Sequence, residues 1–167
     1  MTRRTLIVAL VVPVFLLTAG FRTQQKILAT DPNAQPPEER ALQDRLPKSN
    51  DALWSKLLDS KVAYDNRTGI YRITVSPQIR ALANRQVTAS GWVLPLDGSD
   101  RTRHFLLTRR TPVCMFCPPG EPNEVAEVVS PTAIPWTDRL VTVSGQFSLV
   151  NNGEKGIFFK IAANSVH

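Results

Sequence analysis

The sequence predicts a mainly β fold, a small curled five-stranded sheet or OB-like barrel with one or two short helices. Five short strand-like runs follow one another in the C-terminal half of the chain. Two of the runs contain an internal glycine, which is typical of a bend or bulge in a curled sheet. Thirteen prolines against eight glycines favour turns and extended segments over long helices.

The five expected strands are separated by turn residues. Asp97-Gly98 is a strong hairpin signal between the first two. The internal glycines, Gly91 and Gly145, end similar short sequences and predict matching bends in two strands. The strands are expected at residues 86–96, 104–108, 124–129, 140–150 and 156–161.

Two short helices are expected before the first of these strands. Asn50 or Asp51 can cap a helix in which apolar side chains recur at helical spacing. Trp54 lies in this segment, and we interpret it as a core anchor. A second short helix is expected over residues 77–84, after Ser76-Pro77.

The N-terminus predicts export. Arg3 and Arg4 precede an apolar stretch over residues 5–17, and small residues follow at 18–20. This stretch is short for a membrane span, which needs about 20 residues. We therefore expect a signal peptide or N-terminal anchor at 1–20, a flexible Pro-rich tether at 21–49 and an OB-like β domain at 50–167. The protein would be periplasmic or exported, and membrane-anchored if the leader is not cleaved.

The charge pattern argues against nucleic-acid binding. The formal net charge is +6, but the basic residues are scattered along the chain. Their only local concentration contains four arginines with one aromatic ring, Phe105, apart from His104. Such a pattern is typical of a solvated strand edge.

Both cysteines of the chain lie in the segment Cys114-Met115-Phe116-Cys117, directly before two prolines. Three chemistries use two sulfur atoms at this spacing: a soft metal site, a redox pair, or a structural disulfide. For zinc or copper, the thiolates of Cys114 and Cys117 would need further ligands. The candidates are His104 and Glu121, with Glu124 and Met115 as additional donors.

The redox alternative is a periplasmic thiol–disulfide protein in which Cys114 attacks and Cys117 resolves. A thioredoxin-type site requires the first cysteine at the start of a helix that follows a strand. Here prolines follow Cys117, and the next regular segment is expected to be a strand. We expect no catalytic residue beyond this pair, and a structural interaction module is the remaining alternative.

The segment from Gly91 to Glu127 resembles a bacterial exported family, domain of unknown function 3299. The resemblance is most specific from Cys114 to Glu124, and it extends through Gly91–Leu96 and Phe105–Thr108. Many members carry Cys-Ile-His before the prolines, where this chain has a second cysteine. Because histidine cannot form a disulfide, the resemblance implies metal binding. Family members are also similar to proteins found beside zinc-linked transporter components, which implies membrane transporter components as partners.

Overall fold

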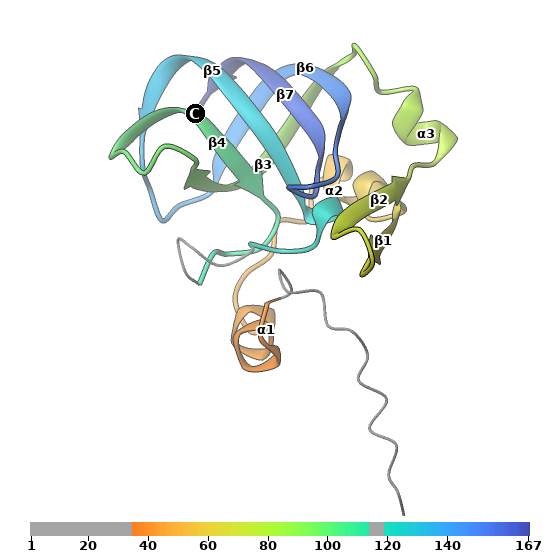
Figure 1. Ribbon diagram of the computed structural model, residues 1–167. Coiled ribbons are helices and arrows are strands. Elements are labelled where there is room, and N and C mark those ends of the chain that lie inside the picture. Colours follow the sequence, from red (N-terminus) through yellow and green to blue (C-terminus); the bar gives the residue numbers. More distant parts are fainter. Residues whose placement is uncertain (1–34, 114–118) are drawn as a thin grey trace, which may run out of the picture.

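The computed structural model describes residues 35–113 and 119–167. Its main body is a closed barrel with the strand order β3-β4-β5-β7-β6, in which β6 pairs again with β3 (Figure 1). The pairing of β5 with β7 is parallel and the other barrel pairings are antiparallel. The predicted OB-like barrel is therefore confirmed. Its strands are β3 (Gln86–Pro95), β4 (Arg101–Thr108), β5 (Val125–Pro135), β6 (Val141–Asn152) and β7 (Ile157–Val166).

Alternating side chains build the barrel core. On β4, Phe105 and Leu107 are buried in the main cluster together with Phe147 of β6 and Phe159 of β7. Period-two alternation places such residues on one face of each strand, and closing the sheet buries that face. The register of β6 against β7 shifts at Gly145, which confirms the bend predicted there.

Helix α2 (Ala52–Leu57) packs on this core. The Asp51 carboxylate accepts hydrogen bonds from the backbone N–H groups of Leu53 at 3.2 Å and Trp54 at 3.3 Å, as expected for an N-cap. Trp54 is fully buried and its Nε1 donates to the carbonyl oxygen of Ser90 at 2.7 Å. The interpretation of Trp54 as a core anchor is confirmed.

A separate two-stranded sheet stands beside the barrel and is formed by β1 (Lys61–Asp65) and β2 (Ile70–Thr74) (Figure 1). The backbone N–H of Tyr71 donates to the carbonyl oxygen of Gly153 at 2.9 Å, which connects this sheet to the β6–β7 turn. Helix α3 (Pro77–Arg80) is shorter than predicted. It gives way to turns that end at Asn84, whose φ of 62° is incompatible with a right-handed helix.

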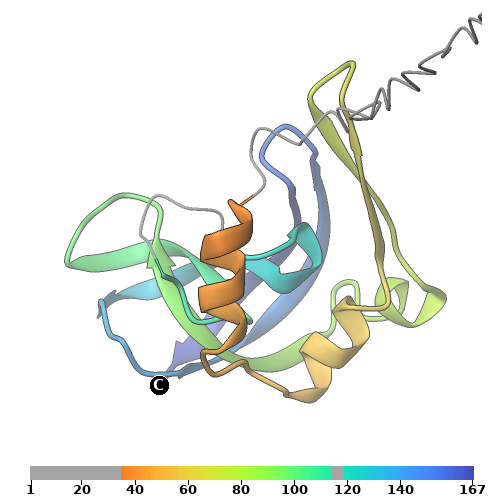
Figure 2. The same ribbon diagram turned by 90° about the horizontal axis from the view of Figure 1, so that it is seen from below.

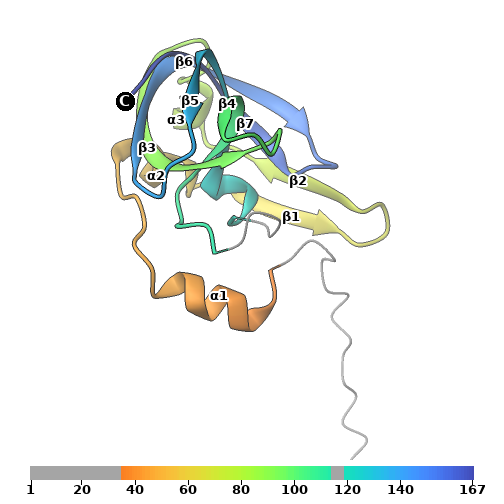
Figure 3. The same cartoon turned by 90° about the vertical axis from the view of Figure 1, so that its left-hand side faces the viewer.

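Residues 35–49 differ from the expected flexible tether. They contain α1 (Pro37–Asp44), which crosses below the barrel near the β4–β5 connection (Figures 2 and 3). A tether was expected because this segment has no apolar face, but α1 is held by a polar side chain instead. Its Gln43 is fully buried. A 3₁₀ turn, η1 (Pro122–Glu124), precedes β5. Within the described residues, no helix is both long and apolar enough to span a bilayer.

Candidate functional site

The two cysteines belong to the connection between β4 and β5. Cys114 and Cys117 themselves lie outside the described residues, so the structure places only the flanks of their segment. We call residues 111–119 the cysteine loop. The upstream flank follows β4 as far as Val113, and the downstream flank runs from Pro119 into η1.

One buried side chain of α1 joins the two flanks of the cysteine loop. The Nε2 atom of Gln43 donates to the carbonyl oxygen of Thr111 at 3.0 Å and to that of Pro119 at 3.1 Å. The Thr111 hydroxyl donates to the carbonyl oxygen of Pro47 at 2.8 Å. Because both carbonyl groups share one amide, the two ends of the loop are held side by side.

A buried carboxylate ties the end of β4 to the start of β5. Glu124 is 2% exposed, and it accepts from Nη1 of Arg109 at 2.8 Å and from Nε of Arg110 at 2.6 Å. It also accepts from the backbone N–H of Glu121 at 3.1 Å. Burial alone would raise the pKa of Glu124, but these hydrogen bonds, that of Arg110 above all, hold it below its ordinary value. Glu124 is therefore ionised at neutral pH.

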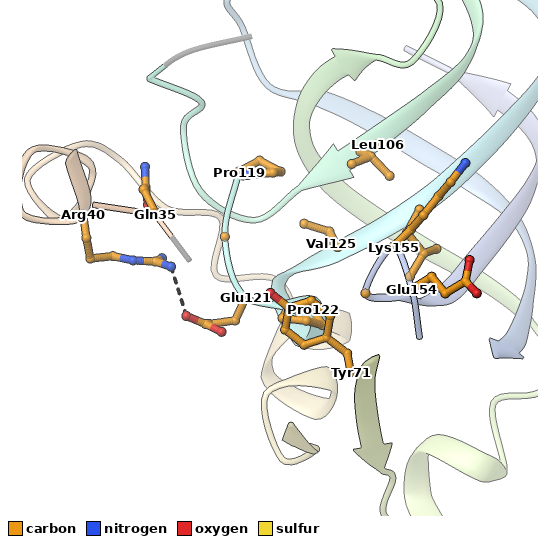
Figure 4. Close-up of a pocket in the computed structure, with 13 residues that line it drawn as sticks. Gln35, Arg40, Tyr71, Leu106, Pro119, Glu121, Pro122, Val125, Glu154 and Lys155 are labelled. Atoms are coloured by element: carbon orange, nitrogen blue, oxygen red, sulfur yellow. Dashed lines mark hydrogen bonds and ion pairs between the residues drawn. The ribbon is translucent and has the colours of Figure 1, made fainter. Parts of the chain in front are cut away.

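A more exposed layer of charges connects α1 to the same region. Asp44 accepts hydrogen bonds from Lys48 at 2.8 Å and from Arg110, and these two cations lower the pKa of Asp44 to about 2. Arg40 donates to Glu121 at 3.0 Å (Figure 4). Helix α1 thus contributes a cation and an anion to the charges around the cysteine loop.

His104, predicted as a metal ligand, lies within β4, and its side chain contacts a carboxylate on the adjacent strand. Its Nε2 is 2.5 Å from Oε1 of Glu127 on β5, and Nζ of Lys160 on β7 is 3.8 Å from the other oxygen of that carboxylate. The three side chains come from neighbouring strands and form a short charged row on the barrel.

Glu121, the other predicted ligand among the described residues, caps η1 and is 58% exposed in its side chain. It pairs with Arg40, whereas His104 pairs with Glu127, so the structure does not bring the two predicted ligands together. Within residues 35–113 and 119–167, no three His, Cys, Asp or Glu side chains gather as a metal site. The cysteines fall outside this test.

A groove of about 390 Å³ lies beside the downstream flank of the cysteine loop. Figure 4 shows Gln35 and Arg40 at one end and Glu154 and Lys155 at the other. Its lining is mostly apolar between these ends, with contributions from Tyr71, Leu106, Pro119, Pro122, Val125 and Ile157. Apolar lining with polar groups at a few places is the usual composition of a ligand site.

Sequence reasoning missed the residues of α1 that hold the cysteine loop. Arg40, Gln43 and Asp44 fall in the segment predicted as a tether, although Pro37 followed by two glutamates is a recognisable helix start. Glu124 was considered only as an oxygen ligand. Its pairing with Arg109 and Arg110 was not predicted.

Comparisons with known proteins give a family but no activity. A crystal structure of a DUF3299 family protein from Pseudomonas aeruginosa is similar to this chain, with 22% identity and a TM-score of 0.47. That match covers 57% of this chain and 66% of the other. None of the curated proteins matches the sequence. The family described as "Protein of unknown function (DUF3299)" matches residues 30–159, most of the chain, and the protein therefore belongs to this family.

Proposed function

We propose that this protein is an exported, non-catalytic domain that handles zinc or copper through Cys114 and Cys117. It would act in the periplasm, as an accessory to a membrane transporter. The observation that carries the proposal is the double hydrogen bond of Gln43 to the two flanks of the cysteine loop. Two thiolates on a loop whose ends are already joined lose less conformational entropy on binding an ion than two thiolates on a free segment.

The charges around the loop support thiolate chemistry. In the ion pairs at its base, four cationic side chains interact with three carboxylates. A positive environment lowers the pKa of a thiol, and the thiolate is the form that binds a metal ion. The cations are Arg40, Lys48, Arg109 and Arg110, and the carboxylates are Asp44, Glu121 and Glu124.

The path of the chain after the loop favours metal handling over thioredoxin-type exchange. The downstream flank enters η1 and then β5, which pairs antiparallel with β4. No α-helix begins between Pro119 and β5, so the helix dipole that activates the first cysteine of a thioredoxin-type pair has no counterpart in this described flank.

His104 is the first proposed ligand beside the two thiolates. A ligating histidine usually donates its other ring nitrogen to a carboxylate, and His104 has Glu127 in that position. Glu121 is the alternative donor, although an ion would have to compete with Arg40 for it.

The second candidate function is thiol–disulfide chemistry by Cys114 and Cys117. The same cationic side chains support it, because a lowered thiol pKa also speeds exchange. An oxidising compartment would favour the disulfide.

Metal content and thiol state of the protein purified from the periplasm distinguish the two candidates. We expect one zinc or copper ion per chain by native mass spectrometry, lost in both Cys114→Ser and Cys117→Ser. The chain has two histidines, so His104→Ala tests the ligand and His167→Ala is its matched control. A metal-free protein with a Cys114–Cys117 disulfide would contradict metal handling and support the redox function.

A further inference from the structure

We infer that the groove beside the cysteine loop is a binding site for a short, extended peptide segment of a partner protein that carries an apolar side chain. This inference goes beyond metal handling and is independent of it. The groove lies between the start of α1, the downstream flank of the cysteine loop and the β6–β7 turn (Figure 4). Its volume of about 390 Å³ is within the range of small-ligand sites.

The groove presents apolar side chains outside the barrel core. Leu106 and Ile157 belong to a small apolar cluster that is separate from the main core. Both form the floor of the groove together with Val125, and all three residues are less than a tenth exposed. An apolar side chain of the ligand would gain free energy because it leaves water when it enters this apolar space.

Gln35 indicates the polar part of the ligand. Its side chain lines the groove and the residue is 7% exposed, yet neither amide atom has a hydrogen-bond partner among the described residues. A buried amide without partners is unfavourable, and a ligand that offers both a donor and an acceptor removes that cost. An extended peptide residue presents its own N–H and C=O on the same side, as in an antiparallel ladder.

The charged side chains at the β6–β7 end of the groove indicate which class of ligand it binds. Glu154 and Lys155 both line the groove, both are exposed, and neither side chain forms an ion pair within the described part of the chain. A segment with polar or charged flanks around its apolar side chain can satisfy both. An acyl chain supplies neither the amide for Gln35 nor two opposite charges, so the groove favours a peptide over a lipid.

The test is a titration of ¹⁵N-labelled protein followed by NMR chemical shifts. The probes are acetyl-Asp-Leu-Lys-amide and the same peptide with serine in place of leucine. We expect the leucine peptide to shift signals of groove residues such as Gly120 and Gly156 and to bind about tenfold more tightly than the serine peptide. Equal affinities, or no shifts in the groove, would overturn the inference.

Gln35→Leu separates recognition from folding. It should weaken the leucine peptide about tenfold, because two hydrogen bonds are lost. It should not lower the unfolding midpoint, since it removes a buried amide that has no partner within residues 35–113 and 119–167. Gln78→Leu, at an exposed position on α3, is the matched control and should leave affinity unchanged.

Two further outcomes count against peptide binding. A lower unfolding midpoint for Gln35→Leu would show that the amide has a structural role. Decanoate is the probe for an acyl ligand. If it shifts the same signals as strongly as the leucine peptide, the groove binds acyl chains and the inference fails.

Discussion

Glu124→Gln tests whether the buried carboxylate holds the barrel end together. Glu124 is 2% exposed and accepts hydrogen bonds from Arg109, Arg110 and the backbone of Glu121. Glutamine keeps the shape and one oxygen, but it removes the negative charge and places an NH₂ group against a donor. The substitution therefore leaves two largely buried arginines without their shared anion.

The expected cost follows from these contacts. A hydrogen bond to a charged group contributes about 1.5–3 kcal/mol, and removing one partner of a buried ion pair costs about 3–5 kcal/mol. Because glutamine keeps one acceptor, we expect a loss of about 3 kcal/mol in the free energy of unfolding. For a domain of this size, that loss lowers the melting temperature by about 10 °C.

The assay is urea unfolding followed by tryptophan fluorescence, since Trp54 and Trp92 are buried and report on the core. The matched control is Glu121→Gln, the same chemical change three positions away. Its side chain is 58% exposed, and among the described residues it forms an ion pair with Arg40 and takes part in the capping box of η1, so we expect a loss below about 1 kcal/mol. Equal effects of the two substitutions, or a loss below 1 kcal/mol for Glu124→Gln, would refute the reasoning.

Two other predictions concern acid stability and the strand bends. The folded-state pKa of Glu124 is lowered, as is that of Asp44 to about 2, so their stabilisation is complete above the unfolded-state values and is lost as the pH falls through the folded-state values. The urea concentration at the unfolding midpoint should thus decrease as the pH is lowered below about 5. This decrease should be smaller in Glu124→Gln, and an equal decrease in both proteins would contradict the lowered pKa of Glu124. Gly145→Ala would place Cβ against the carbonyl oxygen of Ala162 and should cost more than about 3 kcal/mol or prevent folding. Gly98→Ala, with φ of 64° and open space around it, should cost about 1–2 kcal/mol in the same urea measurement; a larger loss than Gly145→Ala would show that packing at the bend is unimportant.

Much of the fold could be predicted because its signals are local. Asp51 caps α2 through N–H groups two and three residues away. On β4, the alternation of side chains between the two faces of the strand is visible within its eight residues. At both Gly91 and Gly145 a side chain would meet the backbone of the adjacent strand, and at Gly145 the strand register also shifts. Turn residues and period-two patterns act over a few residues, so they can be read before the tertiary structure is known.

The candidate site could be predicted only in part. Cys114 and Cys117 stand out in the sequence as the two sulfur atoms of one short segment. The contacts that hold the flanks of their segment could not be predicted, because Gln43 donates to carbonyl groups 68 and 76 residues further along the chain. The pairing of His104 with Glu127 likewise depends on the register of β4 against β5.

The sequence by itself determined a mainly β domain, the strands and bends of its barrel, and the cysteine pair as the first candidate for chemistry. Only the tertiary structure decided that α1 closes the base of the cysteine loop and that a groove lies beside it. The physical reason is the range of the interactions. Strand patterns and caps arise between near neighbours, whereas buried polar pairing and groove shape arise only when distant segments are packed together.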